Sequence, residues 1–188
     1  MTKANTTAAP SRSRTLDLVY IAAGAALIAV CSWISIPTSI PFTMQTFAVF
    51  LLMSLLGGKR GTLSVLVWLL LGAAGLPVFS GFTGGIGIVL GNTGGYMAGF
   101  LLIGILYMLA EKLFGHKVLP EIAALVLGLA VCYAFGTAWF LLVYTRANGA
   151  VGLGTVLGWC VVPFILPDLF KLALALTISR RIVPFLKK

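Results

Sequence analysis

One acidic and one basic residue lie three positions apart inside the long apolar segment VVPFILPDLFKLALALTI. At this spacing Asp168 and Lys171 share one face of a helix, with Cβ atoms about 5–6 Å apart. A charged group at membrane depth is costly, so it faces a bundle interior or a water-filled cavity and usually has a partner. The pair is therefore either a self-satisfied ion pair that fixes the helix, or a ligand site. In a ligand site the carboxylate would accept N–H groups and the ammonium would donate to a carbonyl or carboxylate.

The glycine-rich stretch SGFTGGIGIVLGNTGGYMAG, residues 80–99, is a second candidate site. It is not a nucleotide loop, because it lacks the third glycine of G-x-G-x-x-G and no G-K-[ST] follows. Irregular backbone at membrane depth occurs only where it is buried in protein or lines a cavity. We therefore expect a loop that folds over a cavity, where Asn92 and Thr93 could bond a polar ligand. The alternative is a flexible external loop, followed by a helix that packs through glycines such as Gly95 and Gly99.

Two other segments have polar or small residues at informative positions. In IPFTMQTFAVF, Thr43 follows two prolines and is a candidate N-cap, while Gln45 either caps the same helix or reaches the cavity. In AAGAALIAV, Ala22 and Ala26 have the small-xxx-small spacing that lets a second helix approach closely. That second helix is either internal or part of another protein.

The sequence lacks the groups that an enzyme site or a metal site needs. It has one histidine, His116, in a predicted loop, and its three cysteines are isolated in apolar segments, where we expect buried small side chains. The other three acidic residues lie near predicted helix ends on the opposite side of the membrane from Asp168, so they cannot pair with it for acid–base chemistry. We therefore expect no catalytic residue, no metal and no cofactor.

The composition indicates what must position these residues. The 188 residues are 60% hydrophobic and 9% charged, with a mean hydropathy of +1.10, whereas a soluble domain is about 25% charged. Apolar runs of about 20 residues, the length that spans a bilayer, recur along the chain. We predict an all-α integral membrane protein whose six spans cover about residues 17–36, 43–57, 61–78, 92–113, 119–144 and 167–183.

Two features of the last part of the chain sharpen this prediction. Pro167 is expected at the first turn of the sixth span, where its missing N–H costs little. Asp168 would then lie at the second helical position, close to the positive end of the helix dipole. Residues 150–165 are either a short helix at the outer surface or the start of a long broken span.

The net charge is +9, and the positions of the basic residues predict how the chain is oriented in the membrane. With six spans both termini share one side, and eleven of the 13 lysines and arginines fall there; the exceptions are Arg146 on the opposite side and Lys171 in the membrane. By the positive-inside rule both termini are cytoplasmic. No soluble basic surface is left for nucleic acid. The predicted organisation is a disordered cytoplasmic tail (1–16), a membrane domain (17–183) and a basic cytoplasmic C-terminus (184–188).

The stretch IPFTMQTFAVFLLMSLLGGKRGTLSVLVWLLLGAAGLPVFSGFTGGIGIVLGNTGGYMAGFL resembles the BioY family, the biotin-specific substrate-capture subunits of energy-coupling-factor (ECF) vitamin transporters. The resemblance covers about residues 17–182, with GLPVFSGFTGG, GNTGGY and DLFK in the family's order. Asn92 stands where the family often has proline. The resemblance implies a six-helix bundle with an outward-facing biotin pocket capped by the glycine-rich loop.

The resemblance also implies roles for particular residues. The carboxylate would suit the N–H groups of biotin's ureido ring, and aromatic side chains at outward helix ends could pack on its rings. The expected ligand-binding residues are Asp168, Lys171, Asn92, Thr93, Gly84, Gly85, Tyr96, Thr43, Gln45, Phe79, Trp139 and Tyr144. The Ala22–Ala26 face would dock a transmembrane coupling protein, and two cytoplasmic ATPases would complete the transporter in the bacterial cytoplasmic membrane.

Two other functions are weighed against biotin capture. A stand-alone carrier driven by protons would need an isolated titrating carboxylate, whereas Asp168 has a lysine beside it. An integral-membrane enzyme would need further acids, bases or metal ligands at the depth of the cavity. The sequence therefore favours a binding subunit over either alternative.

Overall fold

The computed structural model describes residues 11–36, 41–115 and 117–186, and almost all of them are helical. The α-helices in this part of the chain are α1 (Ser11–Trp33), α2 (Gln45–Leu56), α3 (Gly58–Ala73), α4 (Ile86–Val89), α5 (Gly94–Phe114), α6 (Val118–Asn148), α7 (Leu153–Cys160) and α8 (Val162–Leu186). A 3₁₀ turn, η1 (Ser80–Phe82), lies between α3 and α4. Two short antiparallel strands, β1 (Ser35–Ile36) and β2 (Phe42–Thr43), were not predicted.

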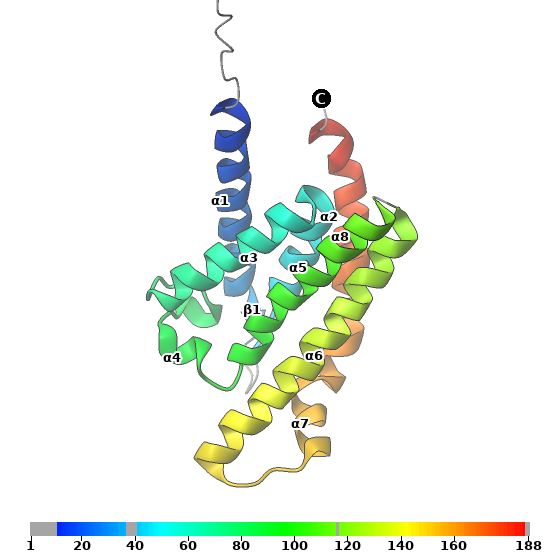
Figure 1. The fold of residues 1–188 in the computed structure, drawn as a ribbon. Helices are drawn as coiled ribbons and strands as arrows, with labels where there is room; N and C mark the ends of the chain where they lie inside the picture. The colour runs from blue at the N-terminus through cyan, green and yellow to red at the C-terminus, as the bar shows by residue number, and fades with distance from the viewer. Residues whose placement is uncertain (1–10, 37–40, 116, 187–188) are drawn as a thin grey trace, which may run out of the picture.

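The long helices run side by side in one bundle (Figure 1). The start of α1 and the end of α8 lie at the same end of the bundle, together with the α2–α3 and α5–α6 turns; we call this the terminal end. The opposite end, called the loop end, has the α6–α7 connection, whereas the end of α1 and the helix α4 lie nearer to the middle of the bundle. The prediction that the two ends of the membrane domain share one side is therefore confirmed.

Four helical stretches are long and apolar enough to cross a membrane, which makes this a multi-pass membrane protein. They are Arg14–Trp33, Gly94–Phe114, Val118–Asn148 and Leu153–Phe185. The helices α2 and α3 have 12 and 16 residues, which is less than the roughly 20 that span a bilayer alone. Large apolar side chains on the outside, such as Leu119, Leu166 and Phe170, are more than 70% exposed and would face lipid.

The predicted start of the last span is wrong. The helix α8 begins at Val162, only Val161 separates it from α7, and Pro167 lies inside it. Proline removes one hydrogen bond from a helix interior. A membrane still favours the helix, because every backbone group outside a helix would lack a partner in lipid. Residues 150–165 therefore belong to a long broken span, one of the two predicted alternatives.

The start of α1 also differs from the prediction. The helix begins at Ser11, so residues 11–16 are helical although they were predicted to belong to the disordered tail. Residues 1–10 lie outside the described residues, as do 187 and 188 of the predicted basic C-terminus. Hydropathy finds where a helix enters the membrane, but the helix itself continues beyond the apolar run.

The helices α5 and α6 pack closely because glycines on one face the backbone of the other. A Cβ atom added to Gly95 would lie 2.3 Å from the Cβ atom of Trp139, and one added to Gly99 would lie 2.6 Å from the Sγ atom of Cys132. Only residues without a side chain permit this approach. The prediction that these glycines pack against a neighbouring helix is confirmed.

The helix α2 lies in the middle of the bundle and packs against α1, α3, α5 and α8. Its residues Ala48, Val49, Phe50 and Met53 are fully buried. This burial fixes the N-terminal turn of α2 beside α8, where the polar residues of both helices meet.

Candidate functional site

Asp168 and Lys171 form a direct ion pair within α8, as their spacing predicts. The Asp168 Oδ1 and Lys171 Nζ atoms are 2.8 Å apart, and the two residues are only 2% and 4% exposed. Because α8 begins at Val162, Asp168 is its seventh residue and not its second. The predicted interaction of Asp168 with the helix dipole is therefore wrong, since that effect fades beyond the first turn.

The Asp168 carboxylate accepts two further hydrogen bonds from other helices. Thr46 of α2 donates to Oδ1 at 2.8 Å, and Tyr133 of α6 donates to Oδ2 at 2.6 Å. An ionised carboxylate can accept about four hydrogen bonds. With Lys171 as the third donor, Asp168 keeps acceptor capacity on Oδ2 while its charge stays stabilised.

The Lys171 ammonium uses all its donors inside the protein. It donates to the Thr43 backbone oxygen at 2.7 Å, to Thr46 Oγ1 at 3.2 Å and to Asp168 Oδ1 at 2.8 Å. It also lies 4.2 Å from the ring centroid of Phe42, a cation–π distance. An ammonium has three donors and no acceptor. In this conformation Lys171 ties the start of α2 to α8 and has no donor left for a ligand.

A cavity of about 220 Å³ adjoins the carboxylate. It is slightly smaller than the pockets of about 300–1,000 Å³ that hold drug-sized ligands, and so suits a small one. Asp168 is the only charged residue among the described side chains that line it. The aromatic lining residues are Phe79, Tyr96, Phe100, Tyr133 and Phe164. A mostly apolar space with one carboxylate suits a small, largely apolar ligand that carries N–H groups.

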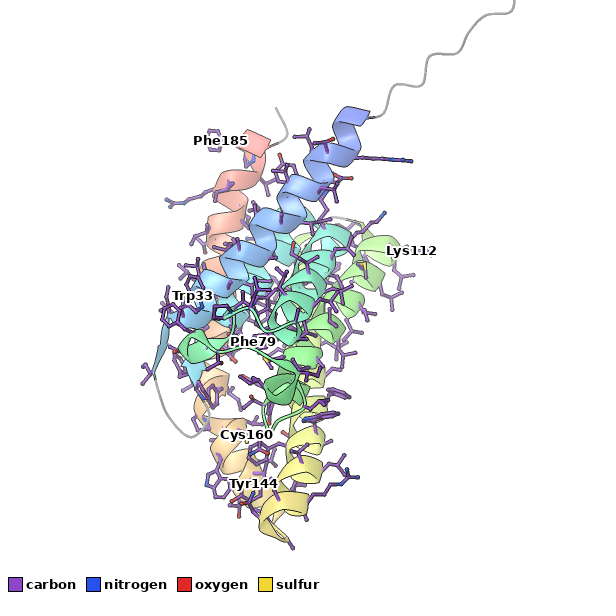
Figure 2. The ribbon with its side chains drawn as sticks, turned by 90° about the vertical axis from the view of Figure 1, so that its left-hand side faces the viewer. Trp33, Phe79, Lys112, Tyr144, Cys160 and Phe185 are labelled. Carbon is purple, nitrogen blue, oxygen red and sulfur yellow. The ribbon has the colours of Figure 1, made fainter. Side chains whose placement is uncertain are left out.

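Figure 2 places this cavity along the bundle. Phe79 lies near the middle, and Cys160 lies nearer to the loop end; both line the cavity. Lys112 and Phe185 lie toward the terminal end. The cavity therefore belongs to the half of the bundle nearer to the loop end.

The segment between α3 and α4 is held in a defined shape against α3. Phe79 N donates to Thr83 O at 3.0 Å, and Gly85 N donates to Gly72 O at 2.7 Å. The indole of Trp68 donates to the Val78 backbone oxygen at 3.0 Å. The side chain of Phe79 is 1% exposed and lines the cavity, as do residues 80 and 83. The glycine-rich segment thus forms part of the cavity wall, and its role as a cap stays a prediction.

The start of α2 supplies a second polar group to the cavity. Thr43 Oγ1 donates to Gln45 Oε1 at 3.0 Å and accepts from Gln45 N at 3.3 Å. Gln45 Nε2 in turn donates to Ser32 Oγ of α1 at 2.8 Å. Although Met44 occupies the N-cap position, Thr43 thus satisfies one of the first N–H groups of α2. The prediction of Thr43 as the N-cap residue is therefore wrong, whereas Thr43 and Gln45 both line the cavity.

The structure brings half of the predicted ligand-binding residues to this cavity. Those that line it are Asp168, Thr93, Tyr96, Thr43, Gln45 and Phe79. Lys171 is placed behind Asp168, and Asn92 lies in the turn between α4 and α5 without lining the cavity. Gly84 and Gly85 contribute backbone packing against the end of α3 and the residues that follow it.

Two predicted aromatic residues lie away from the cavity. The indole of Trp139 donates to the Gly91 backbone oxygen at 2.9 Å, which holds the α4–α5 turn against α6. The ring of Tyr144 stacks on Phe140 at 5.3 Å between centroids, in a separate apolar cluster with α7. Ligand contacts of these two residues stay predictions that the cavity lining does not support.

Sequence reasoning missed several residues of the site. Thr46 and Tyr133 bind Asp168 directly, and Phe164 lines the cavity together with Cys132 and Cys160. The two cysteines are 2% and 3% exposed, so their predicted burial is confirmed, although their place in the cavity wall was not predicted. Tyr133 could have been found from the sequence, because a polar side chain in the middle of an apolar helix indicates a polar partner inside the bundle.

The small-residue faces of α1 point in two directions. Ala25 and Ala29 are buried inside the bundle, at 3% and 6% exposure. Ala22 and Ala26 are exposed on the outer surface. Ala22 and Ala26 therefore do not pack inside the bundle, and their contact with another protein stays a prediction.

A multi-pass helical bundle with a small cavity, and a single paired carboxylate in its wall, has the form of a membrane component that binds a solute. Comparison of the chain with known protein families identifies its family. The chain matches the BioY family over residues 2–188, and it belongs to that family.

Relatives from distant organisms agree with this assignment. The chain is 42% identical over 159 residues to the "Biotin transporter BioY" of Thermotoga maritima, an alignment that covers 84% of this chain and 89% of the relative. It is 36% identical over 156 residues to "Biotin transporter BioY2" of Lactococcus lactis subsp. cremoris, covering 82% and 83%. Each alignment thus covers more than four fifths of both chains.

A solved crystal structure has the same fold. It is the S-component for biotin from an ECF-type ABC transporter, with a TM-score of 0.79 and 29% sequence identity. The match covers 93% of this chain and 94% of that chain. The overall arrangement of helices is therefore shared with that structure.

Proposed function

We propose that this protein captures biotin as the S component of an ECF-type transporter and holds the vitamin in the cavity beside Asp168. The single observation that carries the proposal is the carboxylate itself: it is 2% exposed, forms an ion pair with Lys171, and borders a cavity with no other charged residue among its described lining residues. A buried charge of this kind at membrane depth marks a substrate site. The names of the relatives and of the solved structure identify the substrate as biotin.

The geometry supports distinct roles for the two charges. The free acceptor capacity of Asp168 Oδ2 suits one N–H group of the ureido ring. Lys171 positions and neutralises the carboxylate instead of contacting biotin, because its three donors are occupied. The aromatic walls suit the fused rings, and Thr43, Gln45 and Thr93 offer hydrogen bonds to the remaining polar groups.

The proposal also includes an orientation and partners. Both termini would be cytoplasmic in a bacterial cytoplasmic membrane, with the loop end and its cavity facing outward, in line with the charge distribution. The helices α2 and α3 would complete a six-helix membrane domain around the cavity. Ala22 and Ala26, exposed on α1, would contact the coupling protein of a module that contains two ATPases. Capture and delivery, and not catalysis, would be the task of this chain.

Calorimetric titration of the purified protein in detergent tests the proposal. We expect biotin to bind tightly and desthiobiotin, which keeps the ureido ring, to bind measurably. Asp168→Asn should remove most of the binding, whereas the matched control Asp17→Asn, at an exposed position of the terminal end, should bind as the wild type. Wild-type affinity in Asp168→Asn would overturn the proposed site.

A further inference from the structure

A buried chain of hydrogen bonds joins the end of α1 to the start of α2. Ser32, which is 0% exposed, donates its hydroxyl to the Ile28 backbone oxygen at 2.7 Å and accepts from Gln45 Nε2 at 2.8 Å. Gln45 is 8% exposed and lines the cavity beside Asp168, whereas Ser32 is not among the described residues that line it. Any effect of Ser32 on the cavity therefore passes through the amide of Gln45.

The hydroxyl of Ser32 determines which end of the Gln45 amide lies against it. A hydroxyl group has a single hydrogen, and that of Ser32 is donated to the Ile28 backbone oxygen. Ser32 can then only accept, so its neighbour must be the amide nitrogen and not the amide oxygen. The other end of the amide agrees, because Thr43 Oγ1 accepts from Gln45 N at 3.3 Å and donates to Gln45 Oε1 at 3.0 Å. The hydrogen-bond network thus assigns the orientation of the amide.

The contact with Gln45 distinguishes Ser32 from similar hydroxyl groups in the chain. Thr62, Ser64 and Thr177 each donate to the backbone oxygen four positions earlier in their own helix, as Ser32 does. Such a bond satisfies a hydroxyl inside an apolar helix without a partner from outside. Of these four described residues, only Ser32 also accepts a hydrogen bond from a side chain of another helix. A role confined to α1 would not require that contact.

The amide of Gln45 keeps one donor for a ligand. A primary amide has two N–H groups; one is donated to Ser32, and the described residues show no acceptor for the other. Asp168 lines the same cavity as an acceptor, and Thr46, the residue after Gln45, donates to its Oδ1 atom at 2.8 Å. The cavity wall therefore combines an acceptor with a donor. A ureido ring, which has an N–H group next to its carbonyl, matches both.

We propose that Ser32 is a positioning residue for ligand selection: it fixes the amide of Gln45 so that the second N–H group donates to the ureido oxygen of the ligand. The inference rests on the proposed function, since it takes biotin as the ligand. Without the Ser32 hydroxyl, only Thr43 distinguishes the two ends of the amide, and the amide oxygen can turn toward the cavity beside Asp168. A ligand carbonyl would then meet two acceptors and lose its donor.

Calorimetric titration of the purified full-length protein with biotin and with 2-iminobiotin tests this role. In 2-iminobiotin a C=N–H group replaces the ureido carbonyl, so that a donor stands in place of the acceptor. We expect the wild type to prefer biotin. Ser32→Ala should weaken biotin binding about tenfold, as expected for the loss of one hydrogen bond, and should reduce the preference for biotin. Gln45→Glu, which puts an oxygen in place of Nε2, should shift the preference toward 2-iminobiotin.

Ser64→Ala is the matched control for Ser32→Ala. Ser64 is also 0% exposed and donates to the backbone oxygen of Arg60, four positions earlier, but it is not among the described lining residues of the cavity. This variant should keep both affinities at their wild-type values.

The ratio of the two affinities separates positioning from a structural role. An unchanged ratio in Ser32→Ala, whether both affinities stay or fall together, would overturn the positioning role, as would the same change of ratio in Ser64→Ala. Failure of the wild type to bind biotin would instead overturn the proposed function, and this inference with it.

Discussion

The Asp168–Lys171 pair allows its structural contribution to be measured separately from its role in binding. Asp168→Asn leaves the ammonium buried without its counter-charge, and Lys171→Met leaves the carboxylate in the same condition. Removing one member of a buried ion pair costs about 3–5 kcal/mol. The double variant buries no charge, and replacing both members of such a pair is often neutral for stability. We therefore expect two unstable single variants and a double variant close to the wild type.

The hydrogen bonds that remain around Asp168 or Lys171 determine how much stability each single variant loses. Without Lys171, Asp168 still accepts hydrogen bonds from Thr46 and Tyr133. Without the carboxylate, Lys171 keeps the backbone oxygen of Thr43 and the hydroxyl of Thr46. Both single variants should therefore fold. For a chain of this length each kcal/mol shifts the melting temperature by about 2–4 °C, so a loss of about 3–5 kcal/mol predicts a decrease of about 6–20 °C.

Scanning fluorimetry and calorimetric titration of the same detergent preparations provide the assay. The double variant should regain most of the melting temperature but none of the biotin affinity. As a matched control, neutralising the exposed Asp17–Arg60 pair should cost at most about 1 kcal/mol and leave biotin binding unchanged. Restored biotin binding in the double variant would refute Asp168 as the ligand group. A double variant as unstable as the worse single one would refute the coupling of the two charges.

Three further predictions concern the walls and the outer surface. Tyr133→Phe should lower stability by about 1.5–3 kcal/mol, because the buried carboxylate loses a hydrogen bond; an unchanged melting temperature would contradict this. Gly72→Ala places a Cβ atom 2.0 Å from the Phe79 ring and should weaken biotin binding, whereas Gly154→Ala, with no atom within 4 Å, should not; equal titrations of both would contradict the model of the wall. Ala22→Trp should leave biotin binding intact and block uptake by the assembled transporter; equal loss of both would identify an internal packing face.

The apolar runs of the sequence located the helices well. Backbone N–H and C=O groups in lipid find partners only within a helix, so an apolar run that crosses the membrane is helical. Prediction from these runs misplaced the start of α1 because that helix continues beyond the apolar run, and it misplaced the start of α8 because of a proline. A proline such as Pro167 usually marks a helix start in water, where a broken helix can bond to solvent. Lipid offers no such partner, so the apolar residues before Pro167 stay helical and move Asp168 away from the helix start. The start of α8 is therefore set by the lack of hydrogen-bond partners in lipid and not by the proline.

The candidate site was predictable only where it is local. The spacing of Asp168 and Lys171 fixes their contact, because both lie on one helix face. Thr46 and Tyr133 are 122 and 35 positions away from Asp168, and only the packing of α2 and α6 against α8 brings them to it. Tyr144 was placed at the site because it lies near a predicted outer helix end. The helix α6 has 31 residues and continues past the cavity, so this ring lies beyond it.

Asp168 differs from the other three acidic residues of the chain in its surroundings. Each of the four accepts a hydrogen bond or an ion pair from a different helix, so each joins two parts of the bundle. Asp17, Glu111 and Glu121 do this at the terminal end, where the first two meet α3 and the third meets α2 and α5. Asp168 does it nearer to the loop end, beside a cavity, and has its own lysine. Asp168 differs from Glu121 in its cation, because Asp168 and its lysine lie on one helix and are both buried, whereas Glu121 joins α6 to its neighbours without a salt bridge in the described part of the chain. The lysine pairs with Asp168 in an apolar wall, and a carboxylate with acceptor capacity to spare is what a ligand with N–H groups requires.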